Sequence, residues 1–212
     1  SVVTPIGLDH TTMLGDTVGQ IAREKAGIIK PQGFLVSAAQ QPEAAQVLLD
    51  RARELGDPFR FEGVEFAVTG RSTAVGGQVI TVQGLAGEYP DLMLPLFGAH
   101  QAQNAAVSVA AVEAFVGGGD KPLNPELVAT GLGAVSSPGR LELARKAPPV
   151  ILDAAHNPHG LLASATAVRE AFTFTKLNLV VGVLRDKDAA EMMRVLVDEY
   201  HEFELELWCT RS

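Results

Sequence analysis

Apolar runs of strand length alternate with amphipathic, helix-like segments in both the first and the last part of the chain, and this alternation restricts the fold more than any other feature. The first part has apolar runs at 2–8 and 34–38, each followed by a helix-like segment. Pro42 is expected in the first turn of the second of these helices, and Gly56 is expected to end it. The last part continues this order, with expected strands at 150–153, 177–183 and 203–209 and expected helices at 158–172 and 189–200. Strands that alternate with helices form parallel sheets covered by helices. The chain is therefore predicted to be an α/β protein.

Between these parts, short strand-like runs broken by glycines interrupt the alternation. They lie at 59–61, 64–68, 78–82 and 92–94. Runs of this kind predict a small antiparallel sheet, inserted at about 58–97. An alanine-rich helix is expected at 102–116, and the segment 136–139 is typical of a linker. We therefore expect one domain at 1–138, which carries the insertion, and the first half of a Rossmann-like domain at 139–212.

One helix-like segment places a lysine among apolar side chains. Thr17 and Gln20 form a capping-box pattern at its start, and Gly27 is expected to end it in the left-handed conformation. The stripe with helical spacing consists of Val18, Ile21, Ala22 and Lys25. A lysine held against apolar surface loses hydration, which favours a neutral amine that can act as a nucleophile or accept a modification. The alternative is that Lys25 extends its ammonium group past the helix end into water.

The composition argues against several classes of function. The 25 acidic residues exceed the 17 basic ones, so the net charge is −8 and no nucleic-acid partner is expected. No apolar stretch is long enough to span a bilayer and no signal peptide is recognised, so no membrane partner is expected. The single cysteine, Cys209, excludes an internal disulfide and fits a reducing cytoplasm. Because the sequence opens in one expected strand and stops just after another, it is expected to be a piece of a longer protein.

Two turns carry polar residues suited to ligand binding. Asp153 directly follows an expected strand, at the sheet edge where open α/β folds bind ligands, and its carboxylate can accept hydrogen bonds from hydroxyl or amine groups. His156 can donate to an anionic group, while Asn157 before Pro158 suits a helix cap. Arg140, in Pro138-Gly139-Arg140, has the bidentate donors that suit phosphate, although a lone surface arginine is usually just solvated.

Other patterns carry less information or exclude a site. His100 and Asn104 lie one turn apart on the alanine-rich helix and by default form a polar first turn. The sequence lacks the phosphate loop G-x-x-x-x-G-K-[ST], as well as H-E-x-x-H, C-x-x-C and G-x-S-x-G. A metal hydrolase is disfavoured because the spacing of metal ligands is absent; its candidate ligands would be Asp9, His10, Asp153 and His156.

Six blocks stand in order along nearly the whole chain. They are Leu8-Asp-His10 with Leu14-Gly15, Arg23-Glu-Lys25-Ala-Gly-Ile-Ile-Lys-Pro31, His100-Gln-Ala-Gln-Asn104-Ala-Ala, Ser137-Pro-Gly-Arg140-Leu-Glu142, Asp153-Ala-Ala-His-Asn-Pro158 and Gly182-Val-Leu-Arg-Asp-Lys-Asp188. Together they resemble the folylpolyglutamate synthase and dihydrofolate synthase family, within the wider group of Mur-type, ATP-dependent ligases. The resemblance implies the latter part of a P-loop-type Mur ligase central domain with a small antiparallel β insertion. The first half of a Rossmann-like C-terminal domain would follow it.

The resemblance also implies roles for individual residues. The positions that match ATP contacts are Asn104, Arg140 and Asp153. Lys25 matches the lysine that this family carbamylates, and His10 matches a magnesium ligand. The carbamate would lie near a second magnesium ion. His156 matches a histidine associated with the incoming glutamate.

The implied reaction joins the carboxylate of dihydropteroate or tetrahydrofolate to the amine of L-glutamate through an acyl phosphate, with ATP and Mg²⁺ as cofactors. The protein is expected to be a cytoplasmic monomer. The family's phosphate loop has no counterpart here, so the 212 residues alone are expected to be inactive. One alternative is a catalytically silent binding or scaffold module of the same fold. Another is a Mur-type cell-wall amino-acid ligase, which the blocks around His10 and Lys25 argue against.

Overall fold

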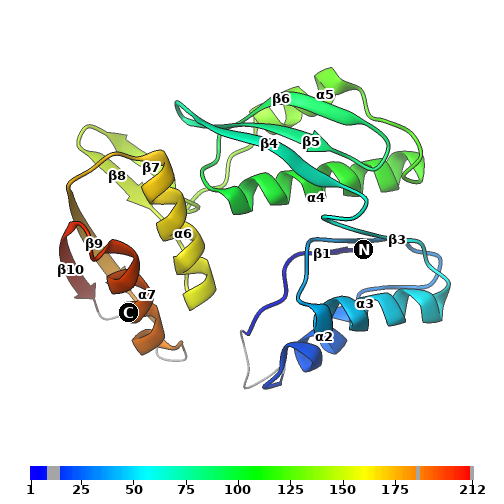
Figure 1. Ribbon diagram of the computed structural model, residues 1–212, viewed down its shortest axis with the longest axis horizontal. Coiled ribbons are helices and arrows are strands. Elements are labelled where there is room, and N and C mark those ends of the chain that lie inside the picture. Colours follow the sequence, from blue (N-terminus) through cyan, green and yellow to red (C-terminus); the bar gives the residue numbers. More distant parts are fainter. Residues whose placement is uncertain (9–14, 185–186, 211–212) are drawn as a thin grey trace. The chain divides into compact units, whose positions relative to one another are not determined.

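The computed structural model describes residues 1–8, 15–184 and 187–210, and the chain divides into two compact units (Figure 1). The N-terminal unit comprises Ser1–Ser72, Val79–Leu94 and Gln101–Ala134. The C-terminal unit comprises Thr73–Gln78, Pro95–His100 and Val135–Ser212. Two short segments from the first half of the chain thus belong to the C-terminal unit.

A parallel sheet organises the first part of the N-terminal unit. Its strands, in spatial order, are β1 (Val2–Val3), β2 (Leu35–Ser37) and β3 (Phe59–Phe61). Every residue of the central strand β2 is buried, as expected for a parallel strand covered on both faces. Helices α2 (Val18–Ala26) and α3 (Pro42–Leu55) pack against each other on one side of the sheet (Figure 1). Their apolar side chains share a core with Val3, Ile6 and Leu35.

Strand β3 corrects the prediction that residues 59–61 belong to the antiparallel insertion. Phe59 pairs with Leu35 and Phe61 pairs with Ser37, both in parallel register. The local sequence of a short strand does not determine its partner, because pairing depends on residues far away in the chain.

Local signals at the helix ends are mostly confirmed. Thr17 and Gln20 form a capping box on α2, in which the Thr17 hydroxyl accepts from the Gln20 amide at 3.2 Å and the Gln20 side chain accepts from the Thr17 amide at 3.1 Å. Pro42 lies in the first turn of α3, and Gly56 ends this helix in the left-handed conformation with φ of 70°. Gly27 has φ of −59°, so the predicted left-handed end of α2 is wrong.

Lys25 is exposed, so its predicted place on an apolar stripe is wrong as well. The buried face of α2 consists of Gly19, Ile21, Ala22 and Ala26. A Cβ atom at Gly19 would overlap the Glu43 carboxylate of α3, which shows how closely the two helices approach. Close packing of small residues therefore sets the rotation of α2 about its axis and turns Lys25 toward solvent.

The glycine-rich middle of the chain forms a second sheet. Its strands, in spatial order, are β4 (Ala67–Ala74), β5 (Gly77–Gln83) and β6 (Glu88–Leu94). Only Val75 and Gly76 separate β4 from β5, and so short a connection allows only antiparallel neighbours. The expected alanine-rich helix is α4 (Ala99–Gly117), and α5 (Pro125–Gly133) packs against β6. None of the helices in the described part of the chain is long and apolar enough to cross a lipid bilayer.

A buried carboxylate joins this sheet to α4. Glu113 is 0% exposed, and it accepts hydrogen bonds from the Tyr89 hydroxyl at 2.7 Å and from the Leu85 amide at 2.5 Å. The Tyr89 oxygen in turn accepts from the Leu123 amide at 2.7 Å. Burial, with the hydrogen bond to Glu113, raises the pKa of Tyr89 to about 12.

The described part of the C-terminal unit contains two strand pairs and two helices. Strand β7 (Glu142–Lys146) pairs antiparallel with β8 (Pro149–Leu152), and β9 (Lys176–Gly182) pairs parallel with β10 (Glu204–Thr210). Helices α6 (Pro158–Ala171) and α7 (Ala189–Tyr200) pack side by side (Figure 1). The sequence pattern predicts each of these elements except β7. The core of the unit includes Phe97, whose ring centroid lies 5.0 Å from that of Phe172.

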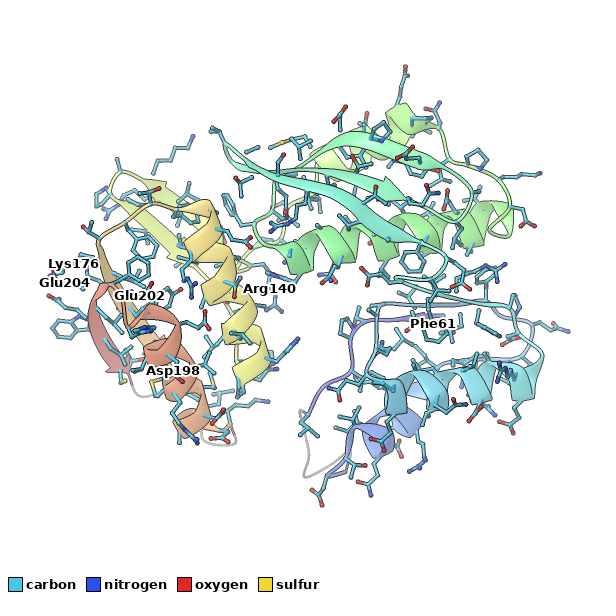
Figure 2. The ribbon with its side chains drawn as sticks, in the orientation of Figure 1. Phe61, Arg140, Lys176, Asp198, Glu202 and Glu204 are labelled. Carbon is cyan, nitrogen blue, oxygen red and sulfur yellow. The ribbon has the colours of Figure 1, made fainter. Side chains whose placement is uncertain are left out.

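One face of the β9–β10 pair is open among the described residues. Val180 and Trp208 are neighbours in register on this face, and their side chains are 71% and 59% exposed. On the same face, Lys176 Nζ lies 3.0 Å from Glu204 Oε1 (Figure 2). The opposite face packs Leu177, Leu179 and their neighbours into the core of the unit.

Candidate functional site

Two turns of the C-terminal unit are joined by hydrogen bonds. The Ala154 amide donates to the Gly139 carbonyl at 2.8 Å, and the Leu141 amide donates to Asp153 Oδ2 at 2.9 Å. The Gly139 amide donates to Glu142 Oε2 at 2.9 Å. The structure therefore brings the turn that contains Arg140 together with the turn that contains Asp153 through two hydrogen bonds.

Both carboxylate oxygens of Asp153 are engaged within the chain. Oδ1 accepts from the Ala155 amide at 2.8 Å and from the Ser164 hydroxyl at 3.0 Å, while Oδ2 accepts from Leu141. A carboxylate has about four lone-pair sites. The described residues use three of them, so Asp153 retains one acceptor position on Oδ2 for a hydroxyl or amine of a ligand.

The guanidinium group of Arg140 is available for a ligand. The side chain is exposed (Figure 2). The main-chain amide of Arg140 donates to the Ser137 carbonyl at 3.1 Å. Among residues 1–8, 15–184 and 187–210, no hydrogen-bond or ion-pair partner occupies this guanidinium. An unoccupied guanidinium on a fixed turn can bind phosphate through two parallel hydrogen bonds.

A hollow of about 310 Å³ borders the same turn. It lies within the C-terminal unit, and its lining includes the apolar residues Leu96, Phe97 and Leu143 together with Ser137 and Arg140. Ligand sites combine apolar walls with a few fixed polar groups. The hollow therefore offers space for the uncharged part of a ligand whose anionic part binds Arg140.

The turn after Asp153 also begins a helix, as its sequence predicts. Asn157 caps α6 by accepting from the Gly160 amide at 2.7 Å, and Pro158 follows in the first turn. His156 is exposed, with Nδ1 3.1 Å from the Ala154 carbonyl oxygen. A proton on Nδ1 therefore completes this hydrogen bond and leaves Nε2 as the other polar atom of the ring.

His100 is a further candidate site residue, although the sequence pattern predicts only that it forms part of a polar first turn of the alanine-rich helix. Its side chain is half-buried, and burial lowers the pKa of the imidazole below its usual value. The nearby Asp153 carboxylate opposes this shift, while Arg140 and His159 reinforce it. These interactions place His100 in the same electrostatic environment as the joined turns.

A buried glutamine fixes the loop before His100. Gln78 is 1% exposed, and its side-chain amide donates to the carbonyls of Leu96 and Gly98, both at 2.9 Å. Gly98 has φ of +94°, and a Cβ atom there would lie 2.7 Å from Ala167 Cβ and 2.7 Å from the His100 ring. In the sequence, the polar residues His100 and Asn104 mark the start of this helix. They give no sign of the contacts that Gln78 and Ala167 make with the loop.

Two more of the sequence-predicted residues, Asn104 and Lys25, belong to the N-terminal unit. Asn104 is exposed on α4 and donates to the Gln101 side chain at 3.3 Å, and Lys25 is exposed in the last turn of α2. His10 lies outside the described residues. Within the described ranges, no group of three or more His, Cys, Asp or Glu residues is arranged to hold a metal ion.

Known proteins share both the sequence and the fold of this chain. A family model described as "Mur ligase, glutamate ligase domain" matches residues 139–207. The dihydrofolate synthase/folylpolyglutamate synthase of Mycobacterium tuberculosis is 45% identical over 203 residues, which cover 92% of this chain and 42% of the relative. The protein of the same description from Bacillus subtilis is 35% identical, with 92% of this chain and 46% of the relative covered.

Solved structures agree with these relatives. The folylpolyglutamate synthase of Mycobacterium tuberculosis, complexed with ADP and AMPPCP, superposes with a TM-score of 0.90 at 42% identity and covers 99% of this chain and 47% of that one. A structure described as an FPGS–AMPPCP–folate complex superposes with a TM-score of 0.85 at 28% identity, and the match covers 99% of this chain and 58% of that one. The chain spans less than half of the length of the two relatives named first. It belongs to the folylpolyglutamate and dihydrofolate synthase family of the Mur ligase superfamily.

Proposed function

We propose that this chain forms the part of an ATP-dependent folate ligase that contacts the nucleotide with its C-terminal unit. The observation that carries the proposal is the exposed Arg140 guanidinium on a turn that hydrogen bonds fix to the Asp153 turn. Such a group suits the phosphates of a nucleotide. The related structures that are complexed with ADP and AMPPCP support a nucleotide ligand for this family.

In the proposed reaction, a carboxylate oxygen of dihydropteroate or tetrahydrofolate attacks the γ-phosphorus of ATP, and ADP leaves. The amine of L-glutamate then attacks the acyl carbon, phosphate departs, and the nitrogen loses a proton as the amide forms. Negative charge is spread over the phosphoryl group during its transfer. The role of Arg140 is to offset this charge at a position fixed before the reaction begins.

Three further residues have proposed roles in binding. Asp153 accepts a hydrogen bond from the nucleotide at its remaining acceptor position, and Asn104 contacts the nucleotide from α4. His156, which is exposed just before α6, is the proposed contact for a carboxylate of the incoming glutamate.

The proposed magnesium site depends on Lys25 and His10. The Lys25 amine is exposed, so carbon dioxide can reach it, and a carbamate would carry the hard oxygen ligands that Mg²⁺ prefers. Magnesium held by these residues would supply positive charge to the phosphates of the nucleotide. Because Lys25 is exposed, no apolar surface keeps its amine neutral. The carbamate is proposed because carbon dioxide can reach this amine and because Lys25 matches the lysine that the family carbamylates.

Equilibrium binding of ADP tests the nucleotide role. The wild-type chain is expected to bind ADP, and Arg140→Ala is expected to weaken binding roughly tenfold, as for the loss of one charge-assisted contact. Arg145→Ala is the matched control, because Arg145 is exposed on the adjacent strand and, within the described part of the chain, its side chain donates only to the Pro148 carbonyl, from Nε at 3.2 Å. Absence of ADP binding by the wild type would favour the silent binding module instead.

The expected lack of ligase activity has its own test, which also separates the acceptor classes if an amide does form. Labelled glutamate is supplied with ATP, Mg²⁺ and either dihydropteroate, tetrahydrofolate or a UDP-muramyl acceptor. The sequence lacks a phosphate loop, so the 212 residues are expected to bind nucleotide without forming any amide. Amide formation on the UDP-muramyl acceptor would replace the folate assignment with the cell-wall one.

A further inference from the structure

The backbone around Arg140 is held in an uncommon conformation. Gly139 has φ of +69° and Leu141 has φ of +48°, so a left-handed residue lies on each side of the arginine. A left-handed conformation is strained for leucine and persists only where the surroundings fix it. The Leu141 side chain is 3% exposed in the core of the C-terminal unit, and its amide donates to Asp153. The direction in which Arg140 leaves the chain therefore depends on what fixes Leu141.

The Asp153 carboxylate is the polar partner that fixes the Leu141 amide, so its own orientation matters. Two of its three hydrogen-bond donors are main-chain amides, those of Leu141 and Ala155. The third donor, the Ser164 hydroxyl, is the one side chain among the described residues that bonds to this carboxylate. Ser164 lies in the second turn of α6, a helix whose start Asn157 caps.

We propose that Ser164 is a positioning residue of the nucleotide site: it fixes the Asp153 carboxylate so that the Leu141 amide, and with it Arg140, keeps one orientation. Helix α6 holds the Ser164 hydroxyl in place, and this hydroxyl holds the Asp153 carboxylate. The carboxylate in turn holds the Leu141 amide, which fixes the direction of the Arg140 side chain. Without the Ser164 hydroxyl, Oδ1 keeps a single donor from its own turn, and the carboxylate can rotate away from Leu141. The link to the nucleotide rests on the proposed function, but the link from Ser164 to Leu141 does not.

Amide hydrogen exchange tests this link in the wild-type chain and in Ser164→Ala, with no ligand present. The exchange rate of the Leu141 amide is expected to rise roughly tenfold in the variant, as for the loss of one hydrogen bond to a charged group. The exchange rate of the Ala155 amide is also expected to rise, because this amide and the Ser164 hydroxyl donate to the same oxygen, Asp153 Oδ1. Ser164→Thr, which keeps a hydroxyl group, is expected to restore the slow exchange of both amides.

Thr166→Ala is the matched control. Thr166 lies on the same helix two residues later and is exposed. Among the residues that the structure describes, its hydroxyl donates only to the Leu162 carbonyl within the helix, at 2.9 Å. A purely structural role of Ser164 would raise exchange throughout the unit, including core amides such as that of Leu196. The positioning role confines the change to the residues bonded to Asp153, while exchange at Leu196 stays at the wild-type rate.

The proposal is overturned if Leu141 exchanges at the wild-type rate in Ser164→Ala, or if Thr166→Ala has the same effect on it. An ADP titration of the same variants separates this result from the proposed function. Affinity is expected to fall several-fold in Ser164→Ala, and to recover in Ser164→Thr, because a mobile Arg140 loses part of its pre-organisation. Unchanged ADP affinity alongside faster Leu141 exchange would contradict the nucleotide role and leave the structural link supported.

Discussion

The main-chain amide of Leu141 donates to Oδ2 of Asp153 across 2.9 Å, although eleven residues separate the two in the chain. Together with the hydrogen bond from the Ala154 amide to the Gly139 carbonyl, this bond joins the turn after the linker to the residues that follow β8. It fixes the backbone beside Arg140 before any ligand arrives. Pre-organisation of this kind is what a phosphate-binding arginine needs if it is to contribute affinity without ordering a flexible loop.

Asp153→Asn is expected to destabilise the C-terminal unit by about 1–3 kcal/mol. The NH2 group of the asparagine would face N–H or O–H groups that now donate to the carboxylate, so at least one hydrogen bond would be lost. The measurement is urea unfolding followed by fluorescence of Trp208, the only tryptophan of the chain, which lies in this unit. The control is Asp198→Asn on α7 (Figure 2), where the side chain is exposed and a change within about 0.5 kcal/mol is expected. Equal effects of the two substitutions would contradict the role assigned to Asp153.

Gly98→Ala is expected to cost about 3 kcal/mol, since it combines a left-handed φ with a Cβ atom only 2.7 Å from Ala167 Cβ. Gly76→Ala is the matched control in the same unit, because Gly76 has φ of +82° but open space around its Cβ position. Strain alone is expected to cost about 1 kcal/mol there. The difference in unfolding free energy between the two variants, again followed by Trp208 fluorescence, measures the cost of the close contact with Ala167. A difference near zero would mean that the loop before α4 moves away at little cost.

Both tyrosines of the chain are expected to lose their phenolic protons at a higher pH than free tyrosine does. Burial, with the hydrogen bond to Glu113, raises the pKa of Tyr89 to about 12, and burial, with the Glu199 carboxylate, raises the pKa of Tyr200 to about 12. Folding therefore favours the protonated phenols, so this contribution to stability is complete below the unfolded pKa of about 10 and is lost as pH rises toward 12.

Absorbance of the phenolate measures this directly. The native chain is expected to show a transition near pH 12, and the urea-unfolded chain one near pH 10, the value for a free tyrosine. Tyr89→Phe leaves Tyr200 as the only signal and assigns the two groups. A native transition near pH 10 would show that water reaches both hydroxyl groups.

Lys25 is expected to form a carbamate when magnesium and bicarbonate are present. With ¹³C-labelled bicarbonate, the carbamate carbon gives a nuclear magnetic resonance signal that Lys25→Arg removes, because a guanidinium does not add carbon dioxide under these conditions. Lys30→Arg is the control, since the Lys30 ammonium already donates to the Gly27 carbonyl at 2.7 Å. A signal that survives Lys25→Arg would assign the modification, and the proposed metal ligand, to another lysine.

Short-range signals predicted much of this structure correctly. The capping pair Thr17 and Gln20, the positions of Pro42 and Gly56 around α3, and the Asn157 cap of α6 all act within one or two turns of the chain. Such interactions depend on residue type and spacing, which a single sequence displays.

Features decided by distant residues could not be predicted in this way. The rotation of α2 follows from its close approach to α3 at Gly19, so an apolar stripe counted within α2 alone put Lys25 on the wrong side. The parallel partner of Phe59 is Leu35, far away in the chain. The contribution of Ser164 to the candidate site likewise depends on a fold that brings α6 beside the Asp153 turn, and no local pattern marks it.

Chemical-shift mapping of ADP binding by the ¹⁵N-labelled chain tests the central claim most directly, since it reports both whether nucleotide binds and where. The largest shifts are expected at the amides of Arg140, Leu141 and Ala154. In Arg140→Ala the midpoint of these shifts is expected to move to a roughly tenfold higher ADP concentration, whereas Arg145→Ala should titrate like the wild type. Shifts that are absent at saturating ADP, that lie elsewhere in the chain, or that Arg140→Ala leaves unchanged would contradict the assignment of this turn as a nucleotide site.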